Sequence, residues 1–308
     1  MINNENTPGN EIQQKSVSEA RNNYYRRIRK TKRVLTHIVL ILVGVFAVFP
    51  IYYIVVNSLS PLASLASVSV TSMLPTITKL SFDNYFALFA YQNDSLLRFW
   101  FPNTLIYAGT ATVLGLVLSI TSGIGLARFN IPGKKAILYM LLILSTFPFV
   151  IMIIPYYDMF SSLHLTNTYW GLIITYSAGA VIFAAWLSKN YIDSIPKDFE
   201  EAAQIDGYSR TQALFRILIP MTKPVLILAL LLSFLGPYTD YAYINIMVTK
   251  NSLWNLALGM YATTQISSHA INYGMFSAFA VIMGLPIFII FLVFQKYLIA
   301  GFSITMYK

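Results

Sequence analysis

Long apolar segments separated by short polar ones make up most of the chain after residue 33. A helix that crosses a membrane needs about 20 mostly apolar residues. Six segments meet this requirement: 34–57, 102–127, 136–157, 169–188, 222–247 and 274–294. The pattern therefore predicts an all-α, polytopic membrane protein with six transmembrane helices. The fourth segment is diluted by small residues at 176–180, which let helices pack closely in lipid.

The polar segments define the expected domain organisation. Residues 1–33 are polar and end in the basic run RRIRKTKR, so we interpret them as a disordered cytoplasmic tail. The basic run would lie against anionic lipid headgroups or simply set the topology. A cleavable signal peptide is not expected, because the polar region is too long and no A-x-A site follows the apolar run. Residues 34–300 would form the membrane domain, and 301–308 a short cytoplasmic C-terminal tail.

Composition supports a membrane location. Of the 308 residues, 56% are hydrophobic and only 11% are charged, whereas soluble globular proteins carry about 25% charged residues. The chain has no cysteine, which excludes disulfides, thiolate metal sites and a cysteine nucleophile. Its three histidines, at positions 37, 164 and 269, are scattered, so no metal site is expected.

Lysine and arginine are distributed unevenly between the two sides that the six segments define. With the N-terminus in the cytoplasm, 18 of the 21 basic residues fall on the cytoplasmic side, and only Lys79, Arg98 and Lys250 fall outside. Cytoplasmic loops of membrane proteins carry such an excess. The asymmetry predicts that both termini are cytoplasmic, and it explains the net charge of +9 without a nucleic-acid partner.

Residues 196–220, between the fourth and fifth apolar segments, form a charged insert that predicts two short helices. Phe199, Ala202 and Ala203 would share one face of the first helix by their spacing. Gly207 is suited to end this helix in the left-handed conformation. Ser209 and Gln212 have the spacing of a capping box that starts a second helix, and Pro220 would end it. We expect the two short helices and the bend between them to be exposed on the cytoplasmic side, where another protein can approach them.

The insert resembles the EAA loop of permease subunits of ATP-binding-cassette importers. The resemblance is carried by Glu201-Ala202-Ala203, Gly207 and Ile217-x-Ile219-Pro220, with Ile219 where the family usually has leucine. In that family the first helix is a coupling helix that sits in a cleft of a cytosolic ATPase subunit. The resemblance implies ATPase-coupling roles for a set of residues in this insert, namely Glu200, Glu201, Ala202, Ala203, Asp206, Gly207, Ile217 and Pro220.

Other segments resemble the smaller, maltose-type permease of the carbohydrate branch of this family. They are LARFNIPGKK (126–135), LTNTYWGLI (165–173) and LPIFIIFLVFQKYLIAG (285–301), so that the resemblance covers about residues 34–302. The end of the chain, FSITMYK, departs from the small-residue tail that reaches the ATPase in the family.

The resemblance implies a non-catalytic subunit of a bacterial cytoplasmic membrane importer for carbohydrate, such as a maltodextrin. Its partners would be a second homologous permease, two ATPase subunits and an extracellular binding protein. The sequence contains no G-x-x-x-x-G-K-[ST] motif, so ATP and Mg would be bound by the ATPase subunits and no cofactor by this chain.

Two further groups of residues have two interpretations each. Asp240 is the one acid well inside an apolar segment; it would either line the sugar path with Tyr238, Tyr241 and Tyr243 or pack as a hydrogen-bonded residue near the headgroups. In the predicted outer loop, Asn251 and Trp254 would contact the binding protein, or Trp254 would be an interfacial anchor.

Two alternatives to a carbohydrate importer subunit stay open at this stage. One is a permease of the same family for another solute class. The other is a stand-alone secondary transporter, which would need ion-coupling acids or broken helices near the midplane, and for which Asp240 is the sole acidic candidate. A membrane enzyme is disfavoured because no cluster of His, Asp or Glu converges in the sequence.

Overall fold

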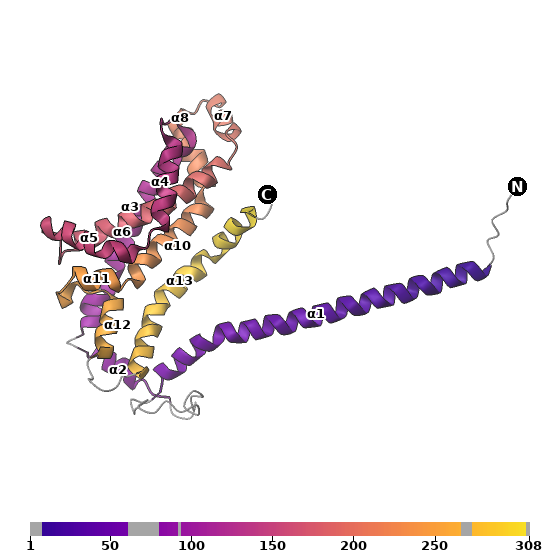
Figure 1. Cartoon of the computed structure of the whole chain (residues 1–308), viewed down its shortest axis with the longest axis horizontal. Coiled ribbons are helices and arrows are strands. Elements are labelled where there is room, and N and C mark those ends of the chain that lie inside the picture. Colours follow the sequence, from indigo (N-terminus) through magenta and orange to yellow (C-terminus); the bar gives the residue numbers. More distant parts are fainter. Residues whose placement is uncertain (1–7, 61–79, 92–93, 266–272, 306–308) are drawn as a thin grey trace. The chain divides into compact units, whose positions relative to one another are not determined.

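The computed structural model describes residues 8–60, 80–91, 94–265 and 273–305, and within these ranges every regular element is a helix (Figure 1). The chain divides into two compact units, residues 1–56 and residues 57–308. The all-α prediction is confirmed. In the part of the chain that the structure describes, four helices are long and apolar enough to cross a membrane, or up to six spans result if each of two bent helix pairs counts as one.

The described part of the first unit belongs to α1 (Pro8–Ser58), a single helix of 51 residues whose last two residues are in the second unit. Its apolar side chains are exposed, for example Phe46 at 81% and Ile41 at 64%, as expected for a helix that lies in lipid. The structure differs from the predicted disordered tail, since residues 8–33 continue the helix toward the N-terminus. The remainder of the predicted tail, residues 1–7, lies outside the described residues.

The second unit contains the other described helices. Short helices lie at its two ends, and longer helices run between them (Figure 1). In chain order they are α2 (Asp83–Phe89), η2 (Leu96–Trp100), α3 (Phe101–Arg128), α4 (Lys134–Thr146), α5 (Phe149–Ser162), α6 (Tyr169–Asp193), α7 (Asp198–Ile205), α8 (Arg210–Ala213), η3 (Leu214–Leu218), α9 (Ile219–Met221), α10 (Lys223–Thr239), α11 (Ala242–Met247), η4 (Asn251–Leu253), α12 (Leu256–Gln265) and α13 (Tyr273–Thr305). Part of the predicted C-terminal tail, residues 301–305, therefore continues α13.

Helices α3, α6 and α10 pack together along their lengths and form the centre of the second unit. Two glycines allow α3 to lie against α6. A Cβ atom at Gly115 would come within 2.8 Å of the Ala180 Cβ, and one at Gly123 within 2.7 Å of the Ser188 Cβ. Small residues at such crossings let helix backbones approach closely in a membrane.

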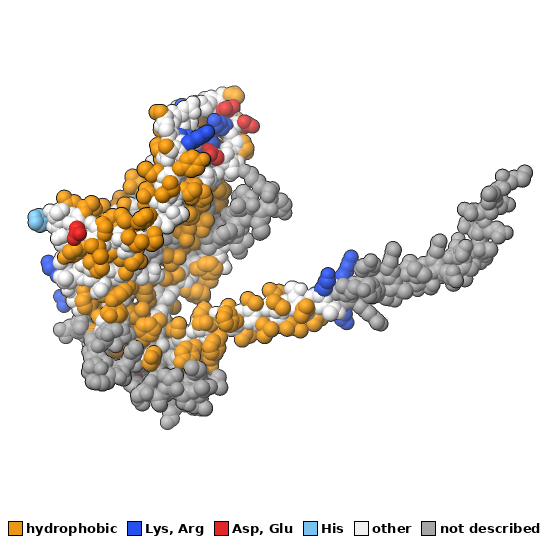
Figure 2. Space-filling view, viewed as in Figure 1, with side chains coloured by type: hydrophobic (Ala, Val, Ile, Leu, Met, Phe, Trp, Pro, Cys, Tyr) orange, Lys and Arg blue, Asp and Glu red, His pale blue; other side chains and the backbone are white. Residues whose placement is uncertain are grey.

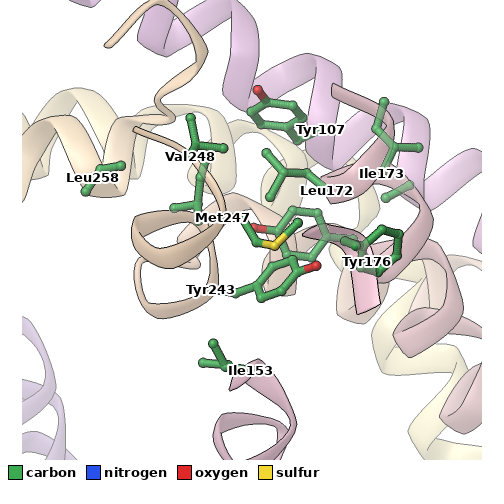
Figure 3. Close-up of a cluster of buried hydrophobic side chains, with 12 residues drawn as sticks. Tyr107, Ile153, Leu172, Ile173, Tyr176, Tyr243, Met247, Val248 and Leu258 are labelled. Carbon is green, nitrogen blue, oxygen red and sulfur yellow. The ribbon is translucent and has the colours of Figure 1, made fainter. Parts of the chain in front are cut away.

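Three clusters of buried apolar side chains hold the second unit together. The first joins α3, α5, α6, α11 and α12, and in it Tyr176 and Tyr243 meet edge to face with ring centroids 5.8 Å apart (Figure 3). The second surrounds Trp100, which stacks on Trp254 and Phe279. The third is small and consists of Ala127, Ile192, Ile195 and Leu218.

The predicted third span, residues 136–157, is not one straight helix. It is divided between α4 and α5, which meet at a bend of 99°. The bend lies at Phe147 and Pro148, because a residue before proline is disfavoured from helical geometry and Phe147 accordingly has an extended ψ of 127°.

The predicted fifth span, residues 222–247, is longer than the helix in the structure. Its helix α10 ends at Thr239, and Asp240 adopts an extended conformation before α11 begins. Asp240 lies outside α10 because its side chain is used to cap α11, as described below. The residues before α10, from Arg210 to Met221, form a helical segment that meets α10 at a bend of 69°.

Candidate functional site

The insert between α6 and α10 folds as a helical hairpin in which α7 is followed by a tight turn and then by α8, η3 and α9 (Figure 1). Gly207 has a φ of 92°, in the left-handed region that favours glycine. Its N–H donates to the Gln204 carbonyl at 3.1 Å, and the Tyr208 N–H donates to the Ala203 carbonyl at 3.0 Å. This pair of bonds is a Schellman motif, so the predicted glycine stop is confirmed.

The start of the second helix also follows the sequence. The Gln212 N–H donates to the Ser209 Oγ at 3.3 Å, and the Ser209 N–H donates to the Gln212 Oε1 at 2.9 Å, which completes a capping box. The segment continues through η3 and α9 to Met221, one residue beyond Pro220. Both ends of the turn are thus fixed by local hydrogen bonds.

The exposed side of the hairpin is partly apolar. Ile205 is 87% exposed, Phe215 is 64% exposed and Phe199 is 50% exposed. Ala202, Glu201 and Asp206 are exposed as well, and Pro220 lies at the far end of the hairpin. Charged side chains gather at this end of the second unit among apolar ones (Figure 2). Exposed apolar groups beside charges are typical of a surface that another protein covers.

The predicted shared face of α7 is divided by the fold. Ala203 is buried beneath the hairpin, whereas Ala202 and half of Phe199 are exposed. The reason is that η3 packs back onto α7 and covers one side of it. The surface available to a partner is therefore formed by Ala202 and its exposed neighbours, without Ala203.

Glu200 is directed into the chain. Its Oε1 lies 2.6 Å from the Arg128 Nε, and the two side chains are 12% and 5% exposed. The Arg128 Nη2 also donates to the Ile195 carbonyl at 2.9 Å. Arg128 is not among the residues that the sequence predicts to be functional; its signal in the sequence is a cation directly after the second apolar segment, on the same predicted side of the membrane as the acidic insert.

Asp240 lies where α6, α10, α11 and α12 meet. Its carboxylate accepts hydrogen bonds from the Tyr176 hydroxyl at 2.7 Å and from the N–H groups of Tyr243 at 3.3 Å and Ile244 at 3.1 Å. The last two are in the first turn of α11, so Asp240 caps that helix. The Asn255 side chain donates to the Asp240 carbonyl at 2.6 Å. These contacts match the hydrogen-bonded packing interpretation.

Asp240 also borders a cavity of about 350 Å³ between α6 and α10. Thr175, Tyr176 and Ser233 contribute the other polar groups of its wall. A second cavity of about 390 Å³ lies between the α4–α5 bend and α6, and the two cavities share Phe149 and Gly179. Volumes of this size are those of small-molecule sites.

The tyrosines that were predicted to accompany Asp240 are not gathered around this cavity. Tyr238 is fully buried and its hydroxyl donates to the Met283 carbonyl at 2.9 Å. Tyr243 is fully buried and its hydroxyl lies 2.7 Å from that of Thr175. Tyr241 packs on Tyr261, with ring centroids 4.6 Å apart. Tyr176, which sequence analysis missed, is the tyrosine that lines the cavity.

The loop that carries Asn251 and Trp254 is fastened to the start of α3. The Trp100 Nε1 donates to the Asn251 Oδ1 at 2.9 Å, and Trp100 stacks on Trp254. Asn103 donates to the carbonyls of Ser252 and Trp254, both at 2.9 Å. The loop is therefore held in one conformation by the α3 end.

Known proteins resemble this chain in sequence. Residues 111–304 match the family described as "Binding-protein-dependent transport system inner membrane component". The arabinooligosaccharides transport system permease protein AraQ of Bacillus subtilis is 31% identical over 225 residues, which are 73% of this chain and 78% of that protein. The maltose/maltodextrin transport system permease protein MalG of Vibrio vulnificus is 33% identical over 212 residues, 66% of this chain and 70% of that protein.

A solved structure supports the fold. A chain of a bacterial ABC transporter involved in the import of the acidic polysaccharide alginate superposes with a TM-score of 0.71. It is 23% identical, and the match covers 86% of this chain and 95% of that one.

Proposed function

Since the chain belongs to the family of binding-protein-dependent transport system inner membrane components, we propose that it forms one half of a membrane path for carbohydrate. It is a multi-pass protein of the bacterial inner membrane and resembles sugar permeases. A second, homologous permease would form the other half of the path. Separate ATPase subunits, which bind ATP and Mg, would drive the cycle, and an extracellular binding protein would deliver the sugar.

The observation that carries this proposal is the α7–α8 hairpin. Two local motifs fix its turn, and it presents exposed apolar side chains between two helices that belong to the central bundle. An ATPase subunit that covers Ala202 and Ile205 would be able to push on α7 when it closes around ATP. The residues expected to take part in coupling then divide into two groups. Glu201, Ala202 and Asp206 offer exposed contacts, and Glu200, Ala203, Gly207, Ile217 and Pro220 maintain the hairpin.

An oligosaccharide is the proposed cargo. AraQ and MalG carry the names of arabinooligosaccharides and of maltose and maltodextrin. The cavity beside Asp240 has features that suit a sugar, with hydroxyl groups from Thr175 and Ser233 and aromatic rings from Tyr176 and Phe149. Asn251 and Trp254, on the fastened outer loop, are proposed to face the binding protein.

The orientation follows from charge. Because 18 of the 21 basic residues fall in segments predicted to lie on one side, we propose that the hairpin and both termini are cytoplasmic. In this orientation the hairpin is accessible to a cytosolic ATPase, and the loop that carries Trp254 is accessible to an extracellular binding protein.

Reconstitution tests the proposal. The chain is purified with its companion permease and ATPase, placed in liposomes, and supplied with binding protein and radiolabelled sugars, including maltotriose and arabinotriose. We expect uptake that requires ATP on the side of the liposome membrane that carries the ATPase and the binding protein on the opposite side. Uptake by this chain alone, without ATP, would instead identify a secondary transporter, and ATP-driven uptake of a different solute class would overturn the carbohydrate assignment.

A further inference from the structure

We propose that Arg128 is a positioning residue of the transport cycle, and that its ion pair with Glu200 transmits a movement of α7 to α3. We call this ion pair the joint. The inference rests on the proposed function and extends it inside this chain. Arg128 is the last residue of α3, and Glu200 lies in the first turn of α7, 72 positions further along the sequence.

The guanidinium of Arg128 is attached at two points. Its Nε is 2.6 Å from the Glu200 Oε1, and its Nη2 donates to the Ile195 carbonyl at 2.9 Å. A planar guanidinium held by two hydrogen bonds is fixed in orientation as well as in distance. Arg128 therefore links the end of α3 both to α7 and to the segment that leads into α7.

The second helix of the hairpin holds the same point. The Arg210 Nη2 donates to the Arg128 carbonyl at 3.4 Å, and the Arg210 guanidinium lies 4.5 Å from the centroid of the Phe129 ring. Beneath these polar contacts, Ala127 packs with Ile195 and Leu218. Both helices of the hairpin thus contact the end of α3.

The ion pair is a buried direct link between α7 and α3. Of the eight residues of α7, only Glu200 and Ala203 are buried, and Ala203 lies beneath the hairpin itself. A buried ion pair contributes little net stability compared with apolar groups of the same shape, but it can enforce one geometry. A joint that must transmit movement needs geometry rather than added stability.

The path onward from α3 leads to the cavity. Helix α3 lies against α6 at Gly115 and Gly123 and also packs along α10. Helices α6 and α10 form the two walls that enclose the cavity beside Asp240. A displacement of Arg128 would therefore reach the walls of the proposed sugar path through continuous packing.

The test removes the joint without leaving a buried charge. Arg128→Met is combined with Glu200→Leu, because removing one partner alone would leave the other charge buried and unpaired. The matched control is Lys189→Met with Asp193→Leu. This pair is 2.7 Å apart and also near the cytoplasmic end, but both members belong to α6, so its loss separates no helices.

Movement of the cavity wall is read with a single cysteine. The chain has no cysteine, and Gly236 lines the cavity with open space where a Cβ would lie. Gly236→Cys is introduced into each background, and the complete complex with its ATPase is placed in nanodiscs. The rate of alkylation by a polar maleimide is measured without nucleotide and after trapping with ATP and vanadate, together with the rate of ATP hydrolysis.

We expect nucleotide trapping to change the alkylation rate in the parent and in the α6 control. In the Arg128→Met/Glu200→Leu variant this change should shrink roughly five-fold or more, as for loss of an allosteric coupling, while ATP hydrolysis persists. An unreduced change in that variant overturns the proposal. If nucleotide trapping leaves the alkylation rate of the parent unchanged, the proposed function itself is contradicted.

A second variant is used if the double variant fails to assemble with the ATPase. If the double variant does not copurify with the ATPase, Arg128→Lys is used, since lysine keeps the charge but cannot hold the carboxylate and the carbonyl in one plane. A smaller but clear reduction of the nucleotide response is then expected. An alkylation response equal to that of the parent would contradict the joint.

Discussion

Gly207 is the residue on which the turn between α7 and α8 depends. At its φ of 92° an L side chain is strained, although a Cβ at this position would meet no atom within 4 Å. The requirement is therefore one of backbone conformation and not of space.

Gly207→Ala is expected to destabilise the hairpin by about 1–2 kcal/mol, the cost of left-handed geometry for a residue with a Cβ. The measurement is the melting temperature of the purified complex, together with retention of the ATPase on the membrane subunits. Gly109→Ala is the control, because Gly109 also has open space around it but lies in regular helix. Equal melting temperatures for Gly207→Ala and the parent would refute the role of the left-handed turn.

Asp240 is the second residue whose role the structure makes specific. It caps α11 and holds Tyr176 at the border of the cavity. Asp240→Ala removes all three acceptor contacts, and loss of a helix cap typically costs about 0.5–2 kcal/mol. We expect a lower melting temperature for Asp240→Ala and no change for Asp158→Ala, an exposed acid in α5. If the Asp240 variant melts like the parent, the capping role is wrong.

At the scale of helices, the crossing of α3 and α6 sets how the central bundle packs. At Gly123 a Cβ would meet the Ser188 Cβ at 2.7 Å and the Lys189 backbone N at 3.1 Å. Backbone atoms cannot move aside as a flexible side chain can, so a larger residue must separate the helices.

Gly123→Leu should therefore sharply lower the yield of folded complex, by overpacking that typically costs about 1–3 kcal/mol or more. Gel filtration in detergent measures the folded fraction. Gly109→Leu, in the same helix but facing open space, should be recovered at the parent's level. Normal recovery of the Gly123 variant would show that α3 and α6 are not closely packed there.

The exposed apolar side of the hairpin is an element-scale contact. Ile205→Asp places a charge on its most exposed large side chain, at 87%. We expect the ATPase to dissociate during affinity purification, because a charge buried in an interface without a partner is strongly unfavourable. Leu163→Asp, an equally drastic change at an exposed position after α5, should keep the ATPase bound. ATPase retained by the Ile205 variant would argue against this contact surface.

The elements that sequence predicted well are those set by local chemistry. The glycine stop at 207 and the capping box at 209 and 212 depend on neighbouring residues only, so both were predictable. The ion pair of Arg128 and Glu200 was not, because it joins residues 72 positions apart and depends on how α3 and α7 pack. Likewise, α10 ends at Thr239 because Asp240 caps the following helix. Hydropathy gives no information on this hydrogen bond, so the helix end could not be predicted from it.

At the scale of the whole molecule, the helix bundle of the second unit has the α7–α8 hairpin, the proposed contact for an ATPase, at one end and the loop that carries Trp254 at the other (Figure 1). Between them, α3, α6 and α10 connect the hairpin to the cavity beside Asp240. Apolar patterning predicts six spans, the number obtained in the structure when each bent helix pair counts as one span. It does not predict the 99° bend between α4 and α5, because hydropathy carries no information on the extended backbone at Pro148.

The location of the hairpin is the central claim, and cysteine labelling tests it most directly. Ala202→Cys is expressed in the cysteine-free chain with its partners, and a membrane-impermeant maleimide is applied to intact spheroplasts and to inverted vesicles. We predict labelling in inverted vesicles only, slow while the ATPase is bound and faster after the ATPase has been stripped. Labelling from the outside of spheroplasts, or a rate in inverted vesicles that does not change when the ATPase is removed, would contradict the account.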